Sequence, residues 1–297
     1  MSSRSAFDIL IEYDTYLKVE RNLSEKTRTA YNFDLRKLII YLIKKNDNEP
    51  TIDSITAKEI KDYLSHLQSE HGYKSNTLSR TISSIRKFFD FVIIQNYIEK
   101  NPAINLMNPK LPKKLPIYLV DSELKKLLLS PDISTEKGIR DRSILICLAF
   151  TGMRLSEIVG LDLDDVSFER KTIKVLGKGS KERLTPMNQV VCDAISDYLN
   201  VRPISDDKAV FLNRFNNRFN GRSIENIVKK YVLMSGIAGN KISPHKLRHT
   251  FATLLHMKDV DIIEIQNLLG HESIKSTQIY THTNPKRLKS AVDKLVD

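Results

Sequence analysis

The stretch that most limits how this chain folds is residues 101–119, NPAINLMNPKLPKKLPIYL. It holds four of the ten prolines of the chain, together with three lysines. Proline lacks a backbone N–H and restricts the residue before it, so this composition favours an extended connector over a helix or a central strand. With 297 residues, the chain is also longer than one typical domain. We therefore predict two domains, residues 1–100 and 120–297, joined by a basic linker over residues 101–119.

The first hundred residues carry apolar side chains at helical spacing. One stripe comprises Phe7, Leu10, Ile11 and Leu17. A second helix is expected after Ser24, a good N-cap residue, with the stripe Tyr31, Leu35, Leu38 and Leu42. A third helix is expected over residues 56–69. The N-terminal domain is therefore predicted to be helical.

A fourth helix, SNTLSRTISSIRKFFDFV, has two contrasting faces. Its apolar side comprises Leu78, Ile82, Ile85, Phe89 and Val92, and its polar side comprises Asn76, Arg80, Ser83 and Lys87. The polar side suits contact with a phosphate backbone and with base edges, although a plain solvated face has the same composition. The net charge of +11 and the pI of about 9.4 favour a polyanionic partner, so both interpretations stay open.

The second part of the chain mixes helices and strands. DRSILICLAF is typical of a buried helix that ends at Thr151 and Gly152, and LSEIVGL begins a new short helix. KTIKVLGKGSKERLTPM predicts a β-hairpin with its turn at residues 177–180, and the pattern after it is helical almost to the C-terminus. The predicted fold class is therefore mainly α with a small β-sheet in the C-terminal domain.

The segment SPHKLRHTFATLLH predicts a helix with a polar start. Ser243 is a good N-cap and Pro244 suits the first helical position, so His245 and Arg248 fall on one face of the first turns. The opposite, core-facing side comprises Leu247, Phe251 and Leu254. A helix N-terminus that presents an imidazole and a guanidinium is suited to an oxyanion or a phosphate.

A metal site in this helix is a weaker alternative. His245 and His249 have the spacing of zinc-binding helices, but that motif requires a glutamate after the first histidine. Lys246 stands there, and Arg248 is close by, so two cations would repel a metal dication. We therefore expect no metal, and we expect His249 to be packed or to support its neighbours.

Further candidates lie in three other segments. In TGMRLSEIVGL, Arg154 and Glu157 have the spacing of an intrahelical ion pair, in which Glu157 would orient a neighbour. Lys178 lies at the predicted hairpin tip, from which it could reach a substrate. His271 and Tyr280 lie in GHESIKSTQIYTH, where a packing role is the commoner fate for one of eleven tyrosines.

Taken together, these candidates comprise two arginines, a lysine, two histidines and a tyrosine, without a carboxylate cluster for magnesium. Such cations could stabilise a phosphoryl transition state without a metal. A tyrosine hydroxyl that attacked a phosphodiester would form a covalent phosphotyrosine.

Five ordered blocks of this sequence resemble the tyrosine recombinases, most closely the Xer-type site-specific recombinases. They are YLKVERNLSEKTRTAYNFDL, TGMRLSEIVGL, GKGSKERLTP, HKLRHTFAT and LLGHESIKSTQIYTH, which together span nearly the whole chain. The resemblance implies a site-specific DNA recombinase that acts through a 3′-phosphotyrosine intermediate and a Holliday junction, in Xer-like resolution of chromosome or plasmid dimers. The alternatives are an integrase or transposase of a mobile element, a catalytically silent DNA-binding protein, and a type IB topoisomerase-like enzyme.

The resemblance also implies roles for single residues. Tyr280 matches the nucleophile, while Arg154 and Arg248 match the pair that holds the non-bridging phosphate oxygens. Lys178 matches the lysine that protonates the leaving oxygen, and His245 the histidine that assists proton transfer from the tyrosine.

Two further positions match the family in supporting roles. His271 matches a histidine that donates a hydrogen bond to the phosphate, and Glu157 matches an acidic residue that supports the site. The family chemistry needs no cofactor, neither a metal nor ATP.

The family architecture is a C-shaped DNA clamp made of a helical SAM-like domain and a mixed α/β catalytic domain. It implies a double-stranded DNA partner with an inverted-repeat core site, bound by a homotetramer or by a heterotetramer with a paralogue. A C-terminal helix over about residues 286–296 would contact a neighbouring subunit through Leu288, Val292 and Leu295, or would instead pack on its own domain.

The remaining features fit an ordinary water-soluble enzyme. The start MSSRSAFDIL lacks a signal-peptide pattern, and no apolar run approaches the length of a membrane span, so a cytoplasmic location without membrane contact is expected. Cys147 and Cys192 are too few and too isolated for a disulfide framework, and we expect both to be small core residues.

Overall fold

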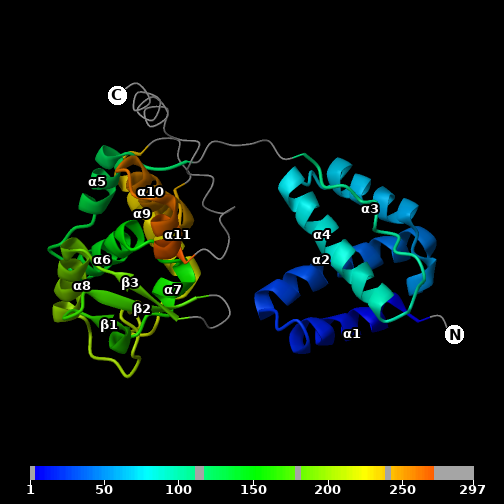
Figure 1. The fold of residues 1–297 in the computed structure, drawn as a ribbon, viewed down its shortest axis with the longest axis horizontal. Helices are drawn as coiled ribbons and strands as arrows, with labels where there is room; N and C mark the ends of the chain where they lie inside the picture. The colour runs from blue at the N-terminus through cyan, green and yellow to red at the C-terminus, as the bar shows by residue number, and fades with distance from the viewer. Residues whose placement is uncertain (1–3, 111–116, 178–181, 238–241, 271–297) are drawn as a thin grey trace, which may run out of the picture. The chain divides into compact units, whose positions relative to one another are not determined.

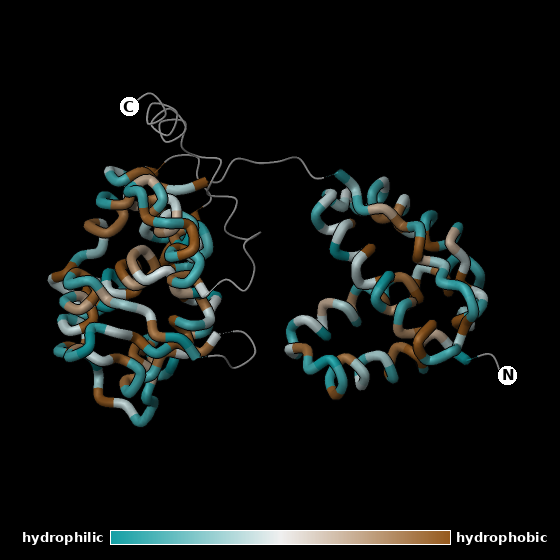
Figure 2. The backbone as a smooth tube through the Cα atoms, viewed as in Figure 1, coloured by the Kyte–Doolittle hydropathy of each residue, from teal (hydrophilic) through white to brown (hydrophobic). Residues whose placement is uncertain are grey.

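The computed structural model of this chain describes residues 4–110, 117–177, 182–237 and 242–270. The chain folds into two compact units, residues 1–114 and 115–297 (Figure 1). Each unit has its own hydrophobic core. Apolar and hydrophilic segments alternate along the helices of both units, as expected for helices that bury one side (Figure 2).

Unit 1 is helical, as the sequence predicted. Its elements are α1 (Ala6–Val19), α2 (Glu25–Asn46), the short 3₁₀ helix η1 (Ile52–Ser54), α3 (Ala57–Ser69) and α4 (Ser75–Ile94). Ser24 caps α2 by accepting from the Thr27 N–H, and Thr56 and Glu59 form a reciprocal capping box at α3. The first residues of α2 and α3 therefore lie where the sequence predicted them.

The core of unit 1 confirms the predicted apolar face of α4. Leu78, Ile82, Ile85, Phe89 and Val92 are all buried, and they pack against the apolar sides of the other helices. The stripe predicted for α1 was wrong at one position. Ile11 is 63% exposed, and the buried residue three positions after Leu10 is Tyr13, whose ring packs edge-on against Phe88 at a centroid distance of 5.3 Å.

Both ends of the predicted linker carry buried side chains. Ala103 and Leu106 are buried in the core of unit 1, and the Arg86 guanidinium donates to the Leu106 carbonyl. Leu119 is buried in the core of unit 2, where its N–H donates to Thr250 Oγ1 at 3.0 Å. Leu119, near the start of the next described segment, is thus attached to α10 (Pro244–Met257), the helix that carries His245 and Arg248.

Unit 2 combines a small sheet with several helices. The helices are α5 (Asp121–Leu129), α6 (Glu136–Phe150), α7 (Leu155–Val159), η2 (Leu163–Asp165), α8 (Gln189–Val201), α9 (Gly221–Met234), α10 and α11 (Ile262–Leu269). The strands β1 (Val166–Ser167), β2 (Thr172–Leu176) and β3 (Glu182–Pro186) pair antiparallel in that order. The fold class, mainly helical with a small sheet in the C-terminal part, agrees with the prediction.

The helix α6 forms the centre of the unit 2 core. Residues Ile144 to Ala149 are nearly inaccessible to solvent, and Cys147 is among them as a free, buried thiol. The helix ends at Thr151, as predicted, and Cys192 on α8 is also buried and free. Within the described part of the chain, no helix is long and apolar enough to cross a membrane.

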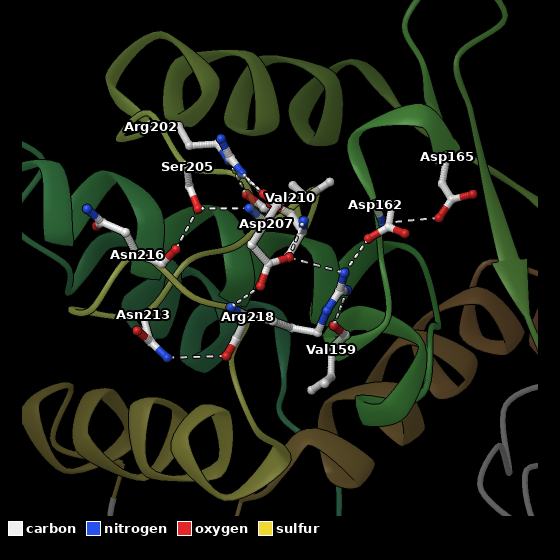
Figure 3. Close-up of polar contacts among 11 residues, drawn as sticks. Val159, Asp162, Asp165, Arg202, Ser205, Asp207, Val210, Asn213, Asn216 and Arg218 are labelled. Atoms are coloured by element: carbon white, nitrogen blue, oxygen red, sulfur yellow. Dashed lines mark hydrogen bonds and ion pairs between the residues drawn. The ribbon is translucent and has the colours of Figure 1, made fainter.

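The connection between α8 and α9 differs from the prediction, which extended a helical pattern through it. Residues 202–220 instead form an irregular loop fastened by a polar network (Figure 3). Asp207 accepts from the N–H of Arg218 at 2.6 Å, while the Arg218 guanidinium donates to the Val159 carbonyl at 2.9 Å and pairs with Asp162. The Arg202 guanidinium donates to the carbonyls of Asp207 and Ala209. Side chains thus replace helical backbone bonds in this segment.

Candidate active site

The start of α10 places two of the predicted site residues. Ser243 accepts a hydrogen bond from the Lys246 N–H, and Pro244 occupies the first turn, as predicted. His245 is exposed, whereas Arg248 is buried, with its side chain only 5% exposed. On the opposite side, Leu247 is fully buried, and Phe251 and Leu254 are half-buried. The imidazole thus lies at the surface of the site and the guanidinium lies beneath it.

Arg248 is fixed by backbone carbonyls from two other segments. Its Nη2 donates to the Leu269 carbonyl at 2.5 Å, and its Nη1 donates to the Gly152 carbonyl. Gly152 has φ of +64°, and a Cβ there would lie 2.7 Å from a ring carbon of Phe251, so only glycine fits this position. Gly152, where the sequence predicted the end of a helix, therefore also supplies a carbonyl acceptor for Arg248.

Glu157, on α7, lies at the centre of the cluster, with its side chain only 1% exposed. It forms the predicted ion pair with Arg154, whose Nη1 lies 2.9 Å from Oε1 and whose backbone N–H donates to Oε2 at 2.7 Å. The Arg248 Nη1 lies 4.0 Å from Oε2. Glu157 therefore lies between the two predicted phosphate-binding arginines.

A third arginine, which the sequence interpretation missed, completes this cluster. Arg183 on β3 binds both oxygens of Glu157, at 2.6 Å for Nη1 to Oε1 and 2.9 Å for Nη2 to Oε2. A signal was present in the sequence. In a strand, residues two apart share a face, so Arg183 lies on the same side as the buried Thr185. A charged residue on the buried side of a short strand requires a partner.

The charge state of Glu157 follows from these contacts. Burial raises its pKa, but the hydrogen bonds from Arg183 and from the Arg154 backbone outweigh burial, so the pKa lies below its usual range. Glu157 is therefore ionised at neutral pH. One carboxylate with three guanidinium groups leaves a net positive cluster, which suits a phosphate.

The end of α11 is part of the same cluster. Arg154 Nη2 donates to the carbonyl of Gly270 at 3.0 Å, and Gly270, with φ of +62°, ends the helix. Together with the Leu269 carbonyl, which binds Arg248, this contact fixes the residue that immediately precedes His271 in the sequence.

His245 and His249 contact each other across one turn of α10. Their Nε2 atoms lie 3.0 Å apart, so one ring donates and the other accepts. Although His245 is partly exposed, partial burial of its ring, followed by the charges of Lys246 and Arg248, lowers its pKa. His245 is thus a neutral imidazole that can accept a proton at neutral pH. Among the described residues, no group of three or more histidine, cysteine, aspartate or glutamate side chains could hold a metal ion.

Three predicted site residues, Lys178, His271 and Tyr280, lie outside the described residues, as does the predicted C-terminal helix over residues 286–296. The structure does describe the segments that lead to them. The strands β2 and β3 bracket Lys178, so the predicted hairpin strands are confirmed, and α11 ends just before His271.

The predicted polar face of α4 lies on the surface of unit 1. Asn76, Arg80 and Lys87 are exposed, while Ser83 is half-buried and donates to the Ser79 carbonyl. Two of these residues are attached to α2. Arg80 pairs at 2.7 Å with the buried Asp34, and Lys87 donates to the Tyr31 hydroxyl at 2.7 Å. These contacts orient both cations, and the exposed surface remains available to a ligand.

Comparison of the sequence with protein families gives two matches. Residues 118–287 match the phage integrase family, and residues 10–96 match the phage integrase N-terminal SAM-like domain. The chain is 37% identical to tyrosine recombinase XerD of Staphylococcus epidermidis, over 95% of this chain and 96% of that protein. It is 36% identical to tyrosine recombinase XerC of Pelotomaculum thermopropionicum, over 94% of each.

Solved structures show the same architecture. The XerH site-specific recombinase, bound to its difH substrate in a pre-cleavage complex, is similar with a TM-score of 0.74 and 26% identity, over 98% of this chain and 90% of that one. The Tn1549 transposon integrase, in complex with transposon right end DNA, has a TM-score of 0.78 over 97% and 99% of the two chains. At 20% identity, this second similarity concerns the fold alone.

Proposed function

Because this chain belongs to the phage integrase family, whose members similar to it are tyrosine recombinases, we propose that it is a site-specific DNA recombinase acting through a 3′-phosphotyrosine intermediate. The observation that carries this proposal is the cluster of Arg154, Glu157 and Arg248 at the start of α7 and α10. It gathers guanidinium groups near helix starts, an arrangement that suits a phosphate.

The proposed reaction exchanges one phosphoester bond for another. The Tyr280 hydroxyl attacks the scissile phosphorus, its proton passes to neutral His245, and the 5′-oxygen leaves with a proton from Lys178. The 5′-hydroxyl of a partner strand then attacks the phosphotyrosine and reverses these transfers. Because each step replaces one phosphoester with another, the bond energy is conserved and no nucleotide cofactor is consumed.

In the proposed reaction, Arg154 and Arg248 stabilise the charge that develops on the phosphate. Arg154 is held by Glu157 and by the Gly270 carbonyl, and Arg248 is held by the carbonyls of Gly152 and Leu269, so both are already oriented before the substrate arrives. Such preorganised cations contribute most where charge grows in the transition state. His271, by the resemblance, adds a hydrogen bond to the same phosphate.

The first test is trapping of the covalent intermediate with EDTA present throughout. The probe is a library of duplexes of random central sequence, each nicked in one strand. Cleavage next to the nick releases a short fragment with the 5′-hydroxyl, so the protein stays attached to the DNA. We expect a DNA adduct on a denaturing gel, and sequencing of the trapped duplexes identifies an inverted-repeat site.

If no duplex in the library gives an adduct, the proposed chemistry is contradicted and a silent DNA-binding protein is favoured. Adduct formation only after addition of a divalent cation would show that the basic side chains do not suffice. When a second intact duplex of the recovered sequence is added, recombinant product is expected. Relaxation of supercoiled DNA without recombinants would instead indicate a topoisomerase-like enzyme.

The role of His245 predicts a distinct pH dependence of cleavage. Because its pKa lies below the ordinary value of 6.5, the imidazole stays proton-accepting to lower pH than a free histidine does. In single-turnover cleavage of the recovered site, the rate should fall only below pH 6.5 as His245 becomes protonated. His245→Gln should cleave more slowly and lose this acid limb. If the cleavage rate of the variant still falls at low pH in the same way, another group is the titrating base.

A Xer-like role, the resolution of chromosome or plasmid dimers, is the cellular function we propose. Full-length similarity to proteins named XerD and XerC supports this role over that of a mobile-element integrase. The partner is DNA, and unit 1 would contact it through the face made of Asn76, Arg80, Ser83 and Lys87. The domains and linker predicted from the sequence are part of this proposal.

We further propose that the enzyme acts as a tetramer, made of identical subunits or with a paralogue. Unit 2 has an apolar groove of about 570 Å³ between α5, α6 and α10, lined by Leu124, Leu128, Phe150, Phe251, Leu254 and Leu255 among others. The stripe of Leu288, Val292 and Leu295 has a matching apolar character. The groove would receive this segment from a neighbouring subunit.

A further inference from the structure

The carboxylate of Glu157 is saturated with hydrogen bonds. Oε1 accepts from Arg183 Nη1 and Arg154 Nη1, while Oε2 accepts from Arg183 Nη2 and the Arg154 backbone N–H. A carboxylate offers about four lone-pair directions, so these contacts fill it. Arg183 supplies two of the four donors.

Arg248 is near this carboxylate but is not hydrogen-bonded to it. Its Nη1 lies 4.0 Å from Oε2, while both terminal nitrogens donate to carbonyls instead. At such a separation an ionised, buried carboxylate still attracts a guanidinium. Loss of Arg183 would open a lone pair on Oε2, the carboxylate oxygen that lies 4.0 Å from Arg248 Nη1.

We propose that Arg183 is a positioning residue for strand cleavage, the counter-ion that holds Glu157 and so leaves Arg154 and Arg248 directed at the scissile phosphate. The proposal rests on the recombinase function inferred above. Arg183 acts through Glu157, and its planar fork is suited to this role because it binds both carboxylate oxygens at once.

Loss of Arg183 would leave a buried carboxylate with one charged partner fewer. Arg248 would then be drawn toward Glu157, away from the phosphate, as long as Glu157 is ionised. Without its counter-ion Glu157 is also easier to protonate, because burial then dominates its titration. Protonation removes the attraction, so the cleavage defect of the variant should shrink as the pH falls.

The experiment compares Arg183→Gln with wild type in single-turnover cleavage of the recovered nicked duplex, across a range of pH. The ratio of the two rates is taken at each pH, so that titration of His245 cancels. We expect cleavage to fall about 10²-fold at pH 8, the scale of a displaced catalytic group, while DNA affinity is unchanged. The ratio should approach one toward lower pH. In the double variant Glu157→Gln/Arg183→Gln, cleavage at pH 8 should exceed that of Arg183→Gln.

The matched control is Arg140→Gln. Arg140 also holds a buried carboxylate, that of Asp141, and the two guanidinium side chains are similarly exposed, 13% for Arg140 and 16% for Arg183. This control should lose a comparable amount of thermal stability and retain the wild-type cleavage rate. If Arg183→Gln does not fold, Arg183→Lys carries the test. An ammonium cannot match both oxygens, so this variant should cleave more slowly than wild type.

The inference is overturned if Arg183→Gln, or Arg183→Lys in its place, cleaves at the wild-type rate. It is also overturned if the defect of Arg183→Gln is the same at every pH and is not relieved in the double variant, since that pattern indicates a structural role alone. These results leave the proposed function intact when wild type forms the adduct. Absence of an adduct from wild type removes the proposed function and this inference together.

Discussion

Replacing Tyr280 with phenylalanine is expected to abolish the covalent adduct and all recombinant product while leaving DNA binding unchanged. The substitution removes one oxygen, the atom proposed to form the bond to phosphorus. Loss of a covalent nucleophile lowers turnover by at least about 10⁴-fold. The measurement is adduct formation on the recovered nicked duplex, with DNA affinity determined in parallel by gel shift.

A tyrosine elsewhere in unit 2 provides the control. Tyr231 is buried on α9, and its hydroxyl donates to Asp141 at 3.0 Å, a residue that is not part of the proposed site. Tyr231→Phe also loses a single hydroxyl, and it should form adduct at the wild-type rate. Adduct from Tyr280→Phe at a rate near wild type would show that another residue attacks the phosphate.

Replacing Arg248 with methionine is expected to have the second largest effect, on both catalysis and stability. One cation proposed to bind the phosphate is lost, which should slow single-turnover cleavage by about 10² to 10³-fold. The carbonyls of Gly152 and Leu269 also lose a charged donor in a buried place. The free energy of unfolding should therefore fall by about 2 to 4 kcal/mol.

Arg248→Lys separates these two effects. It keeps a positive charge but cannot donate to two carbonyls with one fixed geometry. Cleavage should be intermediate between wild type and Arg248→Met, and stability measured by chemical denaturation should be partly restored. Wild-type cleavage by Arg248→Met would mean that this buried guanidinium is only structural.

Local patterns predicted the helices well because their causes are local. Ser24, Thr56 and Ser243 carry side chains that satisfy the first N–H groups of a helix, and all three are N-caps in the structure. The apolar face of α4 was predictable for the same reason, since helical spacing alone determines which side chains share a side. The error at Ile11 arose because the buried face of α1 runs from Leu10 to Tyr13 and Leu17, which leaves Ile11 exposed.

The interior of the site could not be predicted, because its contacts join residues far apart in the chain. Arg183 meets Glu157 across 26 positions, and Arg248 meets the Gly152 carbonyl across 96. Helical spacing predicted that Arg248 and His245 share a face of the helix, but it did not predict that Arg248 is buried while His245 is exposed. The irregular loop at residues 202–220 was missed for a related reason, since Asp207 and Arg218 replace the helical backbone bonds with side-chain contacts.

The family resemblance added what local patterns lacked, namely which of the scattered polar residues belong to one site. Arg154, Glu157 and Arg248 come together in the structure, within hydrogen-bond or ion-pair distance. Lys178, His271 and Tyr280 lie outside the described residues, so their roles remain proposals to be tested chemically.

The most direct test of the central claim is to identify the residue that is bonded to DNA. The trapped adduct is digested with nuclease and trypsin, and the peptide that carries the nucleotide is sequenced by tandem mass spectrometry. We predict a modified peptide spanning residues 276–286, with the phosphate on Tyr280, the only tyrosine in that peptide. A nucleotide attached to any other residue, or an adduct that releases this peptide unmodified, would contradict the claim that Tyr280 is the nucleophile.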